Sequence, residues 1–156
     1  MQNNKITSSD WDFEDLKTPE HDEMILWLLQ EDNLRKLLRK DKDIEIKEIK
    51  TEVPVIAGSN HYIMGYIDLV VRVNWMETDL EGNRKIADTF VLYYEIKPKI
   101  DNFGAIVRQI NKYRECSYTG EWVLFTNDIN YAKFRKAFES QKINTLYWGY
   151  YQSKPK

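Results

Sequence analysis

Two short stretches decide the fold: Gly-Tyr-Ile-Asp-Leu-Val at residues 65–70 and Tyr-Glu-Ile-Lys at residues 94–97. Each sets ionic side chains within an apolar and aromatic run that has the spacing of a β-strand. Glu95 and Lys97 are two residues apart, so they point to the same face of a sheet. Because a buried charge is costly unless it is paired or binds a metal, Asp68, Glu95 and Lys97 are candidate functional residues.

The segment between the two stretches predicts how the strands pair. Glu81-Gly82 is a turn signal, and a hairpin centred there sets Asp68 opposite Glu95. Directly opposed residues have β-carbons about 4.5–5.5 Å apart, and two carboxylates that close repel each other unless something neutralises them. A divalent cation does so, and ligands that are all oxygen favour Mg²⁺ or Mn²⁺ over zinc.

Periodicity outside this hairpin predicts a mixed α/β (α+β) sheet with helices packed against it. Thr18-Pro19-Glu20 is typical of a helix start, and the helix is expected to run to about Lys40 with a break near residues 31–33. By the period of two, one face of the strand at 62–75 carries Ile63, Ile67, Leu69, Val71 and Val73. Strands are predicted at 44–56, 62–75, 90–97, 122–126 and 145–148, and further helices at 102–116 and 130–141.

Length and composition predict one domain in a reduced compartment. The chain has 156 residues, of which 42% are apolar, and this share excludes a disordered chain. Its one cysteine, Cys116, excludes a disulfide framework and a cysteine-built zinc site. No apolar signal core or membrane-spanning run is visible, so we expect a cytoplasmic protein. We predict a mobile acidic N-terminal arm at 1–17 that carries Trp11 and Phe13, a domain at 18–150 and a tail at 151–156.

The charge is unevenly distributed along the chain. The net charge is −2, which excludes strong non-specific electrostatic binding to nucleic acid. Residues 1–90 hold 19 acidic and 12 basic side chains, whereas residues 91–156 hold 11 basic and 6 acidic ones. The C-terminal part is therefore able to face an acidic partner such as DNA.

Three motifs carry a resemblance to a known family. Residues 65–68 are similar to a G-x-[IV]-D strand, residues 95–97 match E-x-K, and Gln109 with Tyr113 looks like Q-x-x-x-Y. Together they resemble the PD-(D/E)XK nuclease superfamily and its RecB-like branch, over about residues 18–148 in element order. Ile67 stands where the family name has proline. The resemblance implies a restriction-endonuclease-like αβββαβ core with an added αβ unit.

The resemblance also implies roles for particular residues. Asp68 and Glu95 would hold Mg²⁺ (or Mn²⁺), with the main-chain carbonyl of Ile96 as a further ligand, while Lys97 orients or helps to deprotonate the attacking water. A third acid from the first helix completes such sites, and Glu23 is preferred over the alternatives Glu20 and Glu52. The residues expected to contact or attract the nucleic-acid backbone are Gln109, Tyr113, Arg108, Lys112 and Arg114.

We therefore expect a metal-dependent nuclease that acts on DNA in repair or recombination, in restriction-like defence, or in a phage or mobile element. A protein partner, a homodimer or a structured substrate would supply specificity. The alternatives are a catalytically silent nuclease-fold protein that binds or regulates a protein partner, and an interaction protein whose acidic face meets a basic partner. His21 is interpreted as a partly buried helix residue. Trp148, Tyr150 and Tyr151 are expected to pack over a sheet edge.

Overall fold

The computed structural model describes residues 18–58 and 61–152 of the chain. The predicted N-terminal arm at 1–17, and residues 153–156 of the predicted tail, lie outside the described residues. No helix in the described part is long and apolar enough to cross a membrane. The elements are α1 (Pro19–Leu28), α2 (Glu31–Leu37), β1 (Ile44–Ala57), β2 (Tyr62–Thr78), β3 (Arg84–Lys97), α3 (Phe103–Glu115), β4 (Glu121–Thr126), α4 (Ala132–Ser140), β5 (Ile143–Tyr147) and α5 (Trp148–Gln152).

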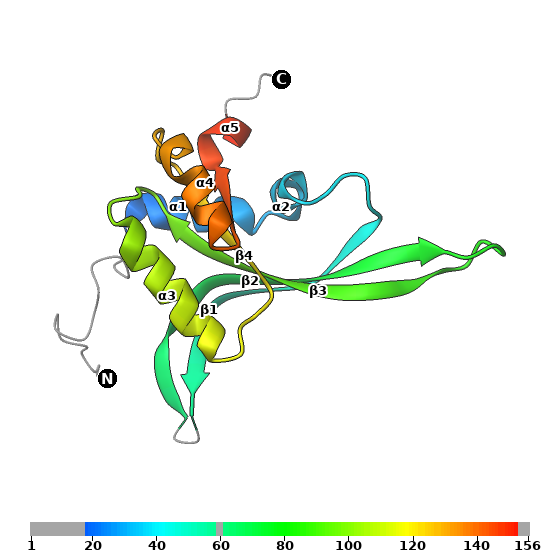
Figure 1. The fold of residues 1–156 in the computed structure, drawn as a ribbon. Coiled ribbons are helices and arrows are strands. Elements are labelled where there is room, and N and C mark those ends of the chain that lie inside the picture. The colour runs from blue at the N-terminus through cyan, green and yellow to red at the C-terminus, as the bar shows by residue number, and fades with distance from the viewer. Residues whose placement is uncertain (1–17, 59–60, 153–156) are drawn as a thin grey trace.

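The five strands form one mixed sheet in the order β1-β2-β3-β4-β5. The first three strands pair antiparallel, whereas β3, β4 and β5 are parallel to one another. Each parallel connection needs a crossover, which α3 and α4 provide. The expected mixed α/β class is therefore confirmed. Figure 1 shows the paired strands β2 and β3 extending well beyond the rest of the sheet.

The sheet has an apolar core on each face. The first core packs α1, α2 and α5 against the sheet, and its buried members include Met24, Leu28, Leu34, Leu69, Val71 and Trp148. The second core packs α3 and α4 against the other face, and its buried members include Val70, Tyr93, Ile106, Ile110, Trp122 and Phe138. Figure 1 shows α3 lying along the sheet, with α1 and α2 in a separate layer. Layers on both faces explain why the central strands are almost continuously apolar.

The predicted register of the β2–β3 hairpin is confirmed from Leu69 to Trp75, which pair with Tyr94 to Asp88. The ladder then shifts by one residue between Trp75 and Met76 and continues to Thr78 opposite Arg84. The prediction that β3 begins at Phe90 was wrong by six residues. Residues 84–89 are exposed, so hydrophobic alternation is not required there and gives no signal.

The predicted faces of β2 were wrong on the N-terminal side of Asp68. Leu69 belongs to the first core, but Ile67 belongs to the second, and Ile63 is 48% exposed. Glu52 of β1 lies between the two pairs that flank Asp68 and has a φ of 50°, a conformation that non-glycine residues rarely adopt. The β2–β3 ladder also ends at Leu69. The strand therefore changes its buried face at Asp68.

The structure confirms the predicted start of α1 and adds a short C-terminal helix, α5, that was not predicted. The Thr18 hydroxyl accepts a hydrogen bond from the His21 N–H at 3.1 Å, with Pro19 in the first turn, as predicted. A break does separate α1 from α2, but it lies at residues 29–30 rather than 31–33, and α2 ends at Leu37 rather than near Lys40. Helix α5 was not predicted: the last strand ends at Tyr147, and the buried Trp148 begins a short helix. The first two residues of the predicted tail are therefore helical.

Candidate functional site

Three ionic side chains are buried where β2 leaves β3. Asp68 is 4% exposed, Glu95 2% and Lys97 5%. The Lys97 Nζ lies 4.0 Å from Glu95 Oε2, as expected for residues two apart on one strand. The ladder between β2 and β3 ends at Leu69 and Tyr94, so the predicted pairing of Asp68 with Glu95 lies one residue beyond the observed pairs. The structure therefore brings together the three residues that the sequence singled out.

Asp68 has a close neighbour at each of its two carboxylate oxygens. Its Oδ2 accepts a hydrogen bond of 2.8 Å from the backbone N–H of Ile96, which ties β2 to β3 just beyond their last ladder pair. Its Oδ1 lies 3.3 Å from Nε2 of His21 on α1. A carboxylate held by a backbone N–H has little freedom to turn, so its position does not depend on a ligand.

His21 is a site residue that the sequence interpretation missed. Its side chain is buried beside Asp68, and its Nδ1 lies 3.6 Å from Asp22 Oδ1. Neither ring nitrogen makes a hydrogen bond of good geometry within the described part of the chain. The cap at Thr18 fixed where α1 begins, but the direction of the His21 ring depends on how α1 crosses the strand ends. Only the tertiary structure supplies that direction.

The three candidates for the third acid occupy different places. The preferred Glu23 is exposed on α1, two residues and therefore more than half a turn away from His21. Glu52 lies opposite Asp68 on β1, but its side chain is exposed. Glu20 is half-buried, and its Oε2 accepts a 2.6 Å hydrogen bond from Asn127, just after β4. The structure thus does not bring Glu23 to the buried carboxylates, and Glu20 is the acid on α1 that faces the strand ends.

Gln109 and Tyr113 lie on the buried side of α3. They are 7% and 1% exposed, and the Gln109 amide donates a 3.3 Å hydrogen bond to the Tyr113 hydroxyl. The Tyr113 ring lies against Gly65 of β2, where an added Cβ would sit 3.0 Å from Tyr113 Cζ. Gly65 is therefore needed for close contact between β2 and α3. Contact of the pair with nucleic acid stays a prediction.

The predicted basic residues of α3 have different surroundings. Arg108 and Lys112 are exposed, and the Arg108 guanidinium lies near Gly104 and so over the first turn of the helix. Arg114 instead donates to the backbone carbonyls of Gln141 and Lys142 at 2.9 and 2.8 Å. Burial lowers the pKa of its guanidinium. Arg114 thus joins α3 to the turn before β5, which corrects its predicted place at the phosphate.

Asp128 holds the segment that follows Lys97. Its Oδ2 accepts from the Ile100 N–H at 2.9 Å and its Oδ1 from the Asn130 N–H at 2.8 Å. Burial raises the pKa of this carboxyl, but the two backbone donors together with the charges of Lys99 and Lys133 keep the pKa below its usual value. The sequence interpretation missed Asp128, although its place directly after a buried strand was a signal.

Asp68 and Glu95 carry the oxygen donors that a hard divalent cation prefers. No group of three or more His, Cys, Asp or Glu side chains in residues 18–58 and 61–152 is arranged to hold a metal on its own. Mg²⁺ does not require such a cage, because it usually keeps several waters and binds one or two carboxylates together with substrate phosphates. Asp68 and Glu95 supply that donor set.

Comparison with known proteins gives no match to a family model, a curated protein or a solved structure.

Proposed function

We propose that this protein is a metal-dependent nuclease that hydrolyses phosphodiester bonds in DNA. One observation carries the proposal: Asp68, Glu95 and Lys97 are all at least nine-tenths buried at the single point where β2 parts from β3. We further propose that β1, β2, β3, α3 and β4 form a restriction-endonuclease-like core after α1, to which α4 and β5 add one αβ unit. The order of the elements along the chain supports this assignment.

The energetics of burial support a functional role for these charges. Removing a carboxylate or an ammonium from water costs several kcal/mol even after relaxation. Apolar side chains of similar volume at these positions would often stabilise a protein by as much or more. A chain that keeps Asp68, Glu95 and Lys97 inside its sheet therefore gives up stability at this place, which is typical of active sites.

Each residue has a role that its position allows. Asp68 and Glu95 would hold Mg²⁺ or Mn²⁺, with the Ile96 carbonyl as a further ligand and the His21 imidazole beside Asp68. The ion, when bound, lowers the pKa of a coordinated water and stabilises charge on the phosphate. Lys97 places a positive charge beside Glu95 that can stabilise the negative charge that develops on the scissile phosphate. The Ile96 N–H keeps Asp68 in place throughout.

The proposal is tested by cleavage of plasmid and single-stranded DNA in Mg²⁺, in Mn²⁺ and in EDTA. We expect wild-type protein to cut only with metal, and both Asp68→Ala and Lys97→Ala to lose at least about 10²-fold in rate. Glu77→Ala, which removes an exposed acid from the same strand, is the matched control and should cut like wild type.

Two outcomes would count against the proposal. Metal-dependent cleavage that survives both Asp68→Ala and Lys97→Ala would show that the activity arises elsewhere. Intact DNA binding without cleavage in any metal would favour the silent nuclease-fold protein that acts through a partner.

A further inference from the structure

Paired strand positions lead from Lys97 on β3 to Tyr147 on β5, whose ring stacks on that of Tyr131. In the register of the parallel strands, Lys97 of β3 pairs with Thr126 of β4, and Thr126 pairs with Tyr147 of β5. All three lie at the carboxyl ends of their strands, where ligands bind in open α/β sheets. Adjacent strands are about 4.8 Å apart, so the backbones at Lys97 and Tyr147 are separated by roughly 10 Å.

Tyr147 is part of a stacked pair. Its ring centroid lies 4.7 Å from that of Tyr131, with 9° between the ring planes. Both residues are half-buried, so part of each residue is accessible to solvent. A Cβ at Gly149 would lie only 2.5 Å from Tyr147 Cζ, so the absence of a side chain there makes room for the ring. Tyr131 is fixed at the N-terminal end of α4.

Two lysines lie near Asp128, which follows Thr126 by two residues. Lys99 and Lys133 are exposed, and both lie close enough to Asp128 to lower the pKa of its carboxyl. The Asp128 oxygens accept hydrogen bonds from backbone N–H groups, which offset its charge. A cationic path beside aromatic rings is the usual construction of a surface that binds single-stranded nucleic acid.

We infer that Tyr131 and Tyr147 form a base-stacking platform for single-stranded DNA that leads to Lys97. This inference rests on the proposed function and names the substrate class of the same site. Duplex bases stack on each other and cannot lie on a protein ring, whereas an unpaired base can. The platform would hold a nucleotide near the scissile phosphate and favour single strands, overhangs or frayed ends over intact duplex.

The test measures binding without cleavage. Full-length protein in EDTA and low salt is titrated into a labelled single-stranded oligonucleotide and into its duplex, and a second oligonucleotide carries 2-aminopurine, whose fluorescence is quenched by stacking. We expect wild type to prefer the single strand. Tyr131→Leu and Tyr147→Leu should each weaken single-strand binding roughly 5- to 100-fold and remove the quenching, while Tyr131→Phe and Tyr147→Phe keep both. Tyr62→Leu, which removes a tyrosine 66% exposed on β2, should change neither.

The outcomes separate the platform from the nuclease. If folded Tyr131→Leu binds single strands and quenches 2-aminopurine like wild type, the platform is wrong, and metal-dependent cleavage by the same preparation would leave the proposed function standing. If both leucine variants lose single-strand and duplex binding equally, the platform is also wrong. Tyrosine-dependent quenching without cleavage in Mn²⁺ would keep the platform and overturn the nuclease.

Discussion

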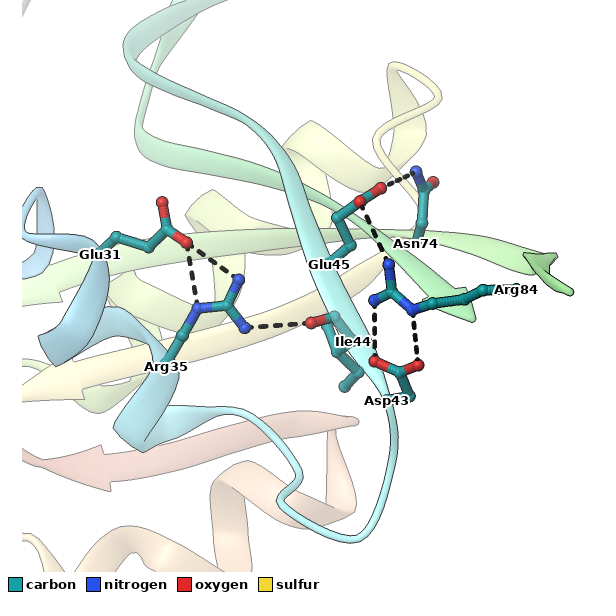
Figure 2. Close-up of polar contacts among 7 residues, drawn as sticks. All are labelled: Glu31, Arg35, Asp43, Ile44, Glu45, Asn74 and Arg84. Carbon is teal, nitrogen blue, oxygen red and sulfur yellow. Dashed lines mark hydrogen bonds and ion pairs between the residues drawn. The ribbon is translucent and has the colours of Figure 1, made fainter. Parts of the chain in front are cut away.

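Ionic side chains are about half exposed at one end of the β2–β3 hairpin and buried at the other. The projecting end is the one that carries the turn between Thr78 and Arg84. There the Arg84 guanidinium makes two 2.9 Å hydrogen bonds to the Asp43 carboxylate, and both side chains are about half exposed. Figure 2 shows Arg84 between Asp43 and Glu45, with Asn74 beside them. At the other end, Asp68, Glu95 and Lys97 are buried.

The exposed charges have little effect on the stability of the fold, whereas the buried charges lower it. The hydrogen bond from Arg84 lowers the pKa of Asp43, yet an exposed pair is screened by water and salt and contributes little to stability. Buried charges are not screened and carry a desolvation cost. The projecting end therefore needs no functional explanation, whereas the buried end does.

The largest effect is expected when the buried pair is removed as a unit. The double variant Glu95→Gln, Lys97→Met should lose at least about 10²-fold in cleavage rate. Its free energy of unfolding should stay unchanged or rise by about 1–4 kcal/mol, because neither member of this pair is left buried without the other. Urea denaturation and plasmid cleavage measure the two properties. A double variant that fails to fold would show that the pair is structural.

The contact between β2 and α3 gives the next effect. Gly65→Ala places a methyl group against the Tyr113 ring, and such overpacking costs about 1–3 kcal/mol in unfolding free energy. Adding Tyr113→Phe removes the hydroxyl closest to this methyl group and should recover part of the loss. Equal stability of Gly65→Ala and wild type in urea would mean that the ring moves aside freely.

Asp128→Asn should cost about 1–3 kcal/mol near neutral pH, because a charged acceptor of two backbone hydrogen bonds is lost. The pKa of Asp128 is lowered in the fold, so its stabilisation is complete above the usual aspartate pKa of about 4 and is lost as the pH falls through the lower folded value. Unfolding curves of the two proteins should converge in acid. A constant difference from pH 7 downward would contradict this assignment.

The smallest effect is expected at the projecting end. Arg84→Ala removes an exposed ion pair, so the melting temperature at physiological salt should not change measurably, and cleavage should match wild type. A clear loss of either property would remove the contrast between the two ends of the hairpin.

The sequence predicted what depends on local pattern and missed what depends on packing between distant segments. The turn near Glu81-Gly82 and the strand period were enough to predict the pairs from Leu69 to Trp75, although a one-residue shift separates these pairs from the turn. The change of face at Asp68 needs the backbone of Glu52 on a different strand, so periodicity could not reveal it. His21 lies far along the chain from Asp68, and Tyr147 comes to lie two strands from Lys97 only through the order of β3, β4 and β5.

The most direct test of the central claim is the melting temperature in Mn²⁺ and in EDTA. If the buried carboxylates hold a divalent cation, Mn²⁺ should raise the melting temperature of wild type in a concentration-dependent way, because a ligand of the native state stabilises it. Asp68→Asn should lose this increase, and Glu77→Gln should retain it. Equal increases in wild type and Asp68→Asn, or none in wild type at any concentration, would contradict the account.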